Sequence, residues 1–367
     1  MDADHNVLIC DGMNGRLRRV SGNGIVTTVS QGFVLPLNVA VTSAGQYIVN
    51  DQAGRRIYKP NGATNTAIAG ANNPSGFGDK GAATEALLLG PAGVAVDRTS
   101  AILIADQSDG RVRRVDAGGA MDTIAGLGAG RGNSGDGGLA TAAGIAQPRG
   151  LAVDPQGNTY VTASRTVRRI DRNGIISTYA GNEQLGFSGD DGPAGQATLN
   201  IPMGVAADAN YVYIADTNNH RIRKLSASGI LTDFAGNGTA GSLGDGGQAV
   251  NAQLSSPIGV TVDGAGNVII VSGLKLRRVA PDGIISTIAG SGSITFSGDG
   301  DLALYAGTYP MSVTTDSAGR VYFSDLAGYR VRRLDPVQIS PAGVVNGASF
   351  LGGGIAPGEI ITIFGWQ

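Results

Sequence analysis

The chain has 367 residues, of which 42% are hydrophobic, 15% are charged and 60 are glycine, and its formal net charge is −2. A nearly neutral chain has no general attraction to nucleic acid or to an anionic membrane surface, and the hydrophobic fraction excludes a disordered chain. No stretch of the sequence is long and apolar enough to span a bilayer, so we expect no membrane insertion.

One unit, with four short apolar segments separated by turn residues, is repeated along the chain. Short β-prone runs with this punctuation predict four antiparallel strands joined as a meander. A partial copy that lacks its first strand, five full copies, and a partial copy that lacks its fourth strand occupy residues 2–30, 37–70, 91–126, 148–181, 202–236, 257–290 and 310–334.

Repetition of this unit predicts an all-β propeller, because one four-stranded sheet buries its faces only when copies stack on each other. We expect one propeller domain over residues 1–336, with seven blades and incomplete terminal blades; six blades with a displaced terminal unit are the alternative. The first strand of each copy carries small or β-branched residues and should line the channel. These innermost strands are expected at residues 39–42, 94–96, 151–153, 205–207, 260–262 and 312–314.

The connectors between copies share a Gly-Asp followed by spaced alanines. The pattern predicts one or two helical turns whose N-cap is the aspartate, with its carboxylate accepting a backbone N–H. The alternative is a ring of acidic loops that binds Ca²⁺ or a cationic ligand, but a calcium loop needs about six to eight oxygen ligands and most copies offer one or two acids. The recurring aspartates are Asp79, Asp136, Asp190, Asp245 and Asp299.

Charged pairs recur at the turn between the second and third strands. Asp106 precedes Arg111 by five residues, and Asp216 precedes Arg221 in the same way. We interpret each as an Asp–Arg bridge that closes the turn or ties neighbouring blades, with an anion-binding arginine ring as the alternative. The basic doublets of the third strands, such as Arg113–Arg114, are interpreted as a solvated outer strand.

Catalytic and metal-binding signals are weak. The only histidines are His5 and His220, both in turns, and two histidines cannot make a three-ligand zinc site. Cys10 is the only cysteine and lies in an apolar run, so we expect it to be buried. We therefore assign no catalytic residue, no metal ligand and no cofactor, with Ca²⁺ as the only ion considered.

The repeat resembles the NHL repeat, most closely at residues 202–236, where Asp208, Tyr213, Asp216, Asn219 and Arg221 match its pattern. The Gly-Asp-Gly-Gly connectors resemble those of bacterial extracellular NHL proteins. The resemblance implies a β-propeller, commonly with six blades, that serves as a binding platform for proteins, RNA or glycans. It also implies a minority alternative, a lyase or hydrolase with a metal in the channel.

The tail at residues 337–367 resembles the opening of a small β-sandwich module that follows such propellers in secreted bacterial proteins. The chain begins and ends inside a unit, so we expect it to be a fragment of a longer secreted or cell-surface protein whose signal peptide is missing from the sequence.

The expected function is binding of a protein, peptide or glycan by a monomeric propeller, at the connector face and the central funnel. The alternative is a propeller enzyme, a lyase or a polysaccharide-active hydrolase, that uses carboxylates or a metal. Loops on a rigid scaffold commonly carry binding residues. The side chains predicted to contact a ligand are the acids and aromatic rings of the most acidic connectors: Asp190, Asp191, Asp299, Asp301, Phe187 and Phe296.

Overall fold

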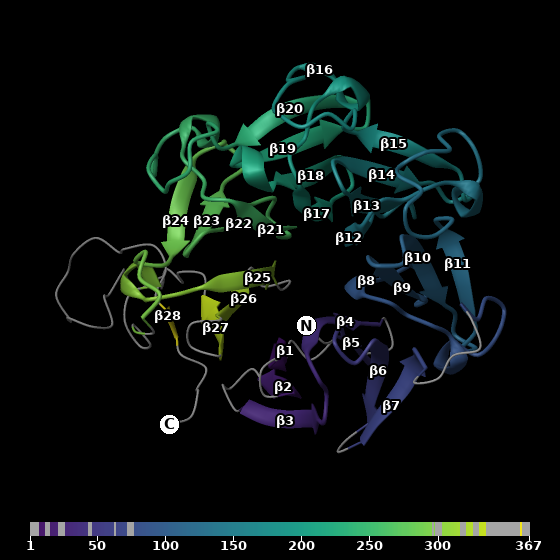
Figure 1. Ribbon diagram of the computed structural model, residues 1–367. Coiled ribbons are helices and arrows are strands. Elements are labelled where there is room, and N and C mark those ends of the chain that lie inside the picture. Colours follow the sequence, from purple (N-terminus) through teal and green to yellow (C-terminus); the bar gives the residue numbers. More distant parts are fainter. Residues whose placement is uncertain are drawn as a thin grey trace.

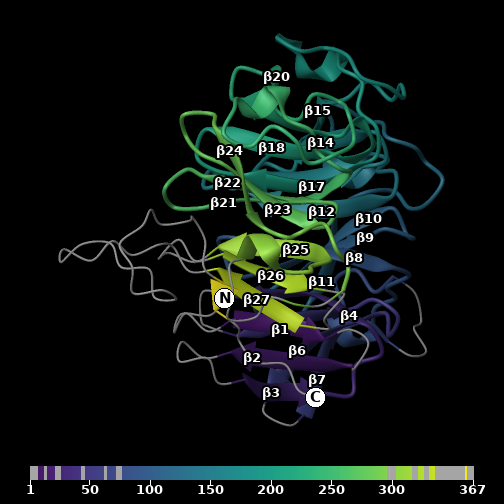
Figure 2. The same cartoon turned by 90° about the vertical axis from the view of Figure 1, so that its left-hand side faces the viewer.

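The protein is a ring of β-sheets around a common axis, and we use the word channel for the region along this axis (Figure 1). The computed structural model describes residues 7–11, 15–20, 26–42, 46–61, 64–71, 77–295, 297, 303–315, 321–325, 330–334 and 360–361. Within these residues the strands form seven sheets, which we call blades 1 to 7 in chain order. The inner strands, such as β21 and β25, run roughly along the axis of the ring, whereas the outer strands turn across it (Figures 1 and 2). The predicted propeller and its seven units are confirmed.

Blades 1 to 3 contain the first eleven strands. Blade 1 consists of β1 (Val7–Asp11), β2 (Arg16–Val20) and β3 (Val26–Gln31). Blade 2 consists of β4 (Pro36–Val41), β5 (Tyr47–Asp51), β6 (Arg56–Asn61) and β7 (Thr64–Ala69). Blade 3 consists of β8 (Pro91–Val96), β9 (Ile102–Asp106), β10 (Arg111–Val115) and β11 (Met121–Ala125).

Blades 4 to 6 follow the same order. Blade 4 consists of β12 (Pro148–Val153), β13 (Thr159–Ala163), β14 (Thr166–Ile170) and β15 (Ile176–Ala180). Blade 5 consists of β17 (Pro202–Ala207), β18 (Tyr211–Asp216), β19 (Arg221–Ser226) and β20 (Ile230–Ala235), with β16 (Gly192–Pro193) as a fifth strand. Blade 6 consists of β21 (Pro257–Val262), β22 (Val268–Ser272), β23 (Lys275–Val279) and β24 (Ile285–Ala289).

The terminal blades differ from the others. Blade 1 lacks an innermost strand among the described residues, as predicted. Blade 7 consists of β25 (Pro310–Thr315), β26 (Val321–Asp325) and β27 (Arg330–Leu334), and a fourth strand, β28 (Ile360–Ile361), pairs antiparallel with β27. The fourth strand that the repeat itself lacks is therefore supplied by residues of the tail. The β-sandwich assignment of residues 337–367 stays a prediction.

The predicted innermost strands are confirmed. The first strands β4, β8, β12, β17, β21 and β25 surround the centre of the ring, and each contacts the next around the channel (Figure 1). Glycine at the third position permits this approach: a Cβ on Gly93 would lie 2.1 Å from the Arg149 carbonyl oxygen, and one on Gly150 would lie 2.6 Å from that of Met203.

Apolar side chains from neighbouring blades form the core. Between blades 2 and 3, for example, Ile48 and Ile57 pack with Ile102 and Ile104. The connector alanines Ala83 and Ala86 belong to the same cluster, and their equivalents lie in the clusters of the following blades. The recurring alanines therefore have a packing role, because a larger side chain would not fit where connector and blades converge.

The long connectors before blades 3 to 6 each cross the outer edge of the blade that follows. In blade 3, Lys80 N–H donates to the Met121 carbonyl, Met121 N–H donates to Gly81, and Ala83 N–H donates to Gly119. We call residues 79–83, 136–140, 190–194 and 245–249 the covering segments of blades 3 to 6. Each places its backbone against the fourth strand, at β11, β15, β20 or β24. An unpaired edge strand is thereby satisfied within the same chain.

The helical turns of the connectors are short 3-10 turns, and the predicted N-cap is wrong. The turns of blades 3 to 6 begin four residues after the recurring aspartate, and none receives a side-chain cap. The aspartate instead binds an arginine, as described below. The connector turns lie at Ala83–Glu85, Ala140–Ala142, Ala194–Gln196, Ala249–Asn251 and Ala303–Tyr305. A further 3-10 turn, Thr217–Asn219, joins β18 to β19.

Candidate functional site

The connector-side mouth of the channel is the candidate site. Every innermost strand begins at this face with proline, at Pro36, Pro91, Pro148, Pro202, Pro257 and Pro310. The residues just before and after the prolines therefore meet around the opening. In blades 4 to 6 the residue before proline has a positive φ: 48° at Gln147, 52° at Ile201 and 41° at Ser256. This conformation is unfavourable for a β-branched residue such as Ile201, and strain of this kind gathers at functional sites.

Apolar side chains are exposed around this mouth. We call five of them the apolar collar; their exposed fractions lie between 39% and 66%, and they are Val34, Leu37, Ile201, Tyr309 and Met311. Met203 and Ile258, at the equivalent position after proline, are half-buried. Isolated exposed apolar residues are common, but exposed apolar residues at the entries of three innermost strands, in blades 2, 5 and 7, are typical of a binding surface. No motif in the sequence indicated the collar; the flanks of the recurring prolines were its only signal.

One cation lies within the mouth. Arg149 is half-buried, and its Nη1 lies 2.9 Å from the Met203 Sδ. With the Gln107 amide oriented so that its oxygen faces the guanidinium, that oxygen accepts from Arg149 Nε at 3.1 Å and from Nη2 at 3.3 Å. Within the described residues no carboxylate lies within ion-pair distance of Arg149. The guanidinium therefore keeps its capacity to bind an anion in a partly apolar setting.

The recurring connector aspartates bind buried arginines of the blade that they cover. The first arginine of the third-strand doublet is fully buried in blades 3 to 6, so the prediction of a solvated outer strand is wrong for this residue. The contacts measure between 2.5 and 2.8 Å and join Asp79 to Arg113, Asp136 to Arg168, Asp190 to Arg223 and Asp245 to Arg277. The same guanidinium groups donate to connector carbonyls, as Arg168 does to Ser134 and Gly144.

The prediction of Asp–Arg bridges across the turn between the second and third strands is also wrong. Asp106 lies opposite Arg111 in the strand register, yet its carboxylate accepts the backbone N–H groups of Leu89 and Gly90. Arg111 pairs with Asp109 instead. The aspartate at the end of the second strand therefore holds the chain segment that enters the innermost strand.

The same backbone anchor recurs in other blades with different side chains. Asp51 accepts from the N–H groups of Val34 and Leu35, and Asp216 accepts from Asn200 N–H. In blade 6 the Ser272 hydroxyl accepts from Ser255 N–H. These side chains fix the backbone on which the mouth residues stand.

Blade 5 holds an extra acid beside its buried arginine. Asp233 occupies the strand position that is Thr123 in blade 3, and its Oδ1 lies 3.0 Å from Arg223 Nε. Arg221 also pairs with Asp233. Burial raises the pKa of Asp233 to about 6 against the opposing effect of Arg223, and the neighbouring Asp190 charge raises it further.

Asp216 has a similar environment beside the same arginine. Its Oδ2 lies 3.5 Å from Arg223 Nη1, and both side chains are fully buried. Burial raises the pKa of Asp216 to about 6, although hydrogen bonds from Asn200 and Asn219 and the Arg223 charge act in the opposite direction. Asp216 and Asp233 of blade 5 are therefore tied to internal cations.

The predicted ligand-contacting residues fall into different environments. Asp190 is committed to Arg223, whereas Asp191 is exposed. The Phe187 ring lies 3.9 Å from the Arg221 guanidinium carbon, which agrees with an anchoring role. Phe296, Asp299 and Asp301 lie outside the described residues. A ligand contact by Asp191 or Phe187 stays a prediction.

The remaining residues singled out in the sequence, His220 and Cys10, have structural contacts in the described chain. His220 Nδ1 accepts the Ser256 N–H, so it joins blades 5 and 6. Cys10 is half-buried and packs beside the cluster formed by Leu8, Leu17 and Phe33. Across the described ranges, no group of three or more His, Cys, Asp or Glu side chains is placed to hold a metal ion, and no helix is long and apolar enough to cross a membrane.

Comparison with known proteins relates the chain to NHL-repeat proteins. The Teneurin NHL domain family matches residues 127–188 and 238–303, and the NHL repeat matches residues 199–225. Mouse (Mus musculus) Teneurin-4 is 32% identical over 172 residues, which are 43% of this chain and 6% of that protein. The chain thus spans only a small part of this relative. Because the relative is an animal protein, the bacterial assignment stays a prediction.

Solved structures share the fold at low identity. Virginiamycin B lyase from Staphylococcus aureus has a TM-score of 0.54 and 14% identity, covering 84% of this chain and 82% of that one. An auxiliary nutrient binding protein from Bacteroides ovatus has a TM-score of 0.55 and 15% identity, covering 82% of this chain and 69% of that one. The chain is therefore a β-propeller that contains segments matching the NHL repeat.

Proposed function

We propose that this propeller is an extracellular binding module that holds a segment of a partner protein at the connector-side mouth of its channel. The apolar collar carries the proposal, because it remains exposed at the place where all the innermost strands begin. Aliphatic side chains such as Leu37 and Met311 suit an apolar peptide segment better than a sugar, whose hydroxyl groups would be buried there without hydrogen-bond partners.

Arg149 adds a polar requirement to the proposed ligand. A guanidinium with no carboxylate partner in the described chain favours a segment that places an acidic side chain or a terminal carboxylate among apolar residues. The extracellular location rests on the resemblance to extracellular NHL proteins. The connector acids have a secondary place in this proposal, since Asp190 is already bound to Arg223.

The test is a binding screen with two defined probes, a phage-displayed library of random peptides and an immobilised glycan array. Leu37→Asp and Met311→Asp each put a charge into the mouth and should abolish, in calorimetry, binding of at least one class of selected peptide. Leu243→Asp is the matched control, because Leu243 is an exposed connector leucine outside the mouth. The proposal is contradicted if no selected peptide loses binding in both mouth variants.

A further inference from the structure

Among the described residues, the outer edge of blade 2 lacks the cover that blades 3 to 6 possess. The connector before blade 2 spans only residues 32–35, between β3 and β4, so no covering segment precedes this blade. Among the described residues, no strand or isolated bridge pairs with the outer side of β7. β7 contacts the neighbouring blade 1 through the side chain of Asn65. Its Nδ2 donates to the Gln31 carbonyl, and its Oδ1 accepts from the Ser30 hydroxyl.

The strand register shows which backbone groups are open. Asn65 lies opposite Pro60 in β6, as Met121 lies opposite Val115 in β10. Met121 exchanges two backbone hydrogen bonds with its covering segment. Pro60 has no N–H, so Pro60 and Asn65 form a non-hydrogen-bonded pair. The backbone N–H and C=O of Asn65 therefore point outward from β7, as those of Met121 point outward from β11. An added strand would therefore pair at Asn65.

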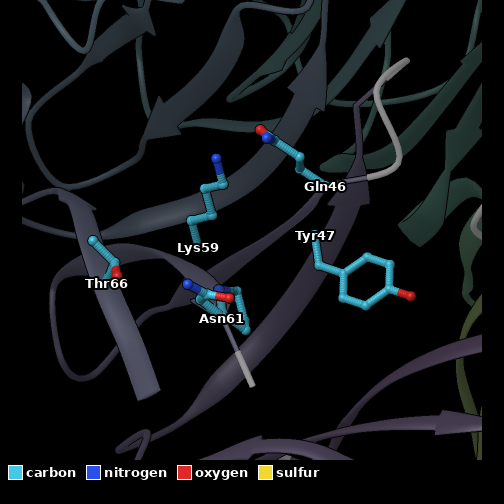
Figure 3. Close-up of a pocket in the computed structure, with 6 residues that line it drawn as sticks. Gln46, Tyr47, Lys59, Asn61 and Thr66 are labelled. Carbon is cyan, nitrogen blue, oxygen red and sulfur yellow. The ribbon is translucent and has the colours of Figure 1, made fainter. Parts of the chain in front are cut away.

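A cavity with an unpaired cation adjoins this open edge. Its volume is ≈ 560 Å³, and it is lined by Gln46, Tyr47, Lys59, Pro60, Asn61 and Thr66 (Figure 3). In blade 3 the residue equivalent to Lys59 is Arg114, which pairs with Asp97 at 3.1 Å and lies opposite Asp122. Blade 2 has Thr42 and Thr66 at the two acidic positions. Lys59 consequently has no ion pair within the described chain.

We propose that β7 is a docking edge for an extended acidic segment of a partner protein, which adds to blade 2 as a fifth strand and places a carboxylate near Lys59. Blade 5 shows the architecture, because β16 is already a fifth strand antiparallel to β20. Backbone pairing supplies affinity in strand addition, and side-chain pockets supply specificity. The charge of Lys59 selects an acidic occupant, and the cavity beside Thr66 accommodates its side chain.

The test selects a phage-displayed library of random linear peptides of about 12 residues, long enough to pair along one edge, on the full chain. Counter-selection uses Asn65→Pro, which removes the outward N–H at an edge position where proline is tolerated. Enriched peptides should be acidic. In calorimetry, Lys59→Glu should weaken their binding by about tenfold or more, since it places like charges together.

Matched variants distinguish pairing at the β7 edge from binding elsewhere on the propeller. Asn65→Ala keeps the backbone N–H and should retain binding, and Lys275→Glu, which reverses a charge in blade 6, should have no effect. Leu37→Asp should leave this binding unchanged, so a failure of the channel-mouth proposal would be seen separately. The proposal is overturned if no enriched peptide responds to both Asn65→Pro and Lys59→Glu. It is also overturned if the wild type sediments as a dimer that Asn65→Pro dissociates, because a second copy would then occupy the edge.

Discussion

Blades 3 to 6 and blade 2 come from the same repeat but complete their outer edges differently. In blades 3 to 6 a covering segment pairs with the fourth strand, and its aspartate reaches a buried arginine such as Arg168. Blade 2 has neither feature: its connector is short, and Tyr58 stands at the position of the buried arginine. Tyr58 packs edge-on against Phe33 of that short connector, with ring centroids 5.4 Å apart.

From this comparison we infer that the covering segment and the buried arginine depend on each other. A guanidinium without the connector aspartate and carbonyls would be a buried, uncompensated charge, which is strongly destabilising. An aspartate without the arginine would leave the covering segment attached by few backbone bonds. Blade 2 lacks both together, and its edge has no backbone partner among the described residues.

The largest expected effect comes from removing a buried guanidinium. Arg168→Met should lower the free energy of unfolding by about 3 kcal/mol, because it removes the buried guanidinium that donates to the Gly144 carbonyl and to the Asp136 carboxylate. Tyr58→Phe, the parallel change in blade 2, removes only the contact from Arg56 and should cost about 1 kcal/mol or less. Urea denaturation measures both, and equal losses would contradict the comparison.

A second change loosens one covering segment directly. Gly189 has a φ of 85°, and a Cβ on it would lie 2.6 Å from the Ala197 Cα. Gly189→Ala should therefore cost about 2 kcal/mol in unfolding free energy. Gly195→Ala in the same connector meets no atom within 4 Å and should change stability by less than about 0.5 kcal/mol. A neutral Gly189→Ala would show that the segment does not hold the blade.

The aromatic contacts of the connectors should contribute less. Phe187→Ala removes a ring that lies over Arg221 and Arg223, and we expect a loss of about 1 kcal/mol. Leu185→Ala is the control, since Leu185 is an exposed apolar residue two positions away. If both variants lose the same stability, the ring has no specific anchoring role.

The smallest expected effect is a change in how the free energy of unfolding depends on pH, caused by Asp233 in blade 5. Because the pKa of Asp233 is raised to about 6 in the folded protein, the folded state binds this proton more tightly than the unfolded state. Its stabilising contribution is present below about pH 4 and is lost as the pH rises through about 6. Asp233→Thr, which restores the residue of blade 3, should flatten the stability profile over this interval. Identical profiles in wild type and variant would show that Asp233 does not titrate there.

The repeat made the blades predictable, because strand period and turn residues are local properties of the sequence. The innermost strands followed from the order of segments within each copy. The contacts of the connector aspartates did not follow, since Asp136 meets Arg168 two strands into the next blade. Recurrence showed that these residues matter, yet local patterns predicted an N-cap and a solvated strand for them.

The candidate sites were still less accessible from sequence. Leu37, Ile201 and Met311 are ordinary apolar residues, and only the closure of the ring brings them to one opening. β7 lacks the backbone partner that the fourth strands of blades 3 to 6 have among the described residues. This difference can be recognised only when the covering segments of the other blades are known. Acidic loops gave a stronger signal in the sequence, but Asp190 binds an internal arginine.

Backbone hydrogen exchange by NMR tests the central claim most directly, that covering segments close the edges of blades 3 to 6 and leave blade 2 open. The N–H groups of Met121, Ile176 and Ile285 donate to Gly81, Gly138 and Gly247 of the connectors and should exchange slowly. The Asn65 N–H, at the equivalent position of β7, should exchange at a rate near that of an exposed amide. Protection of Asn65 equal to that of Met121 would contradict the account.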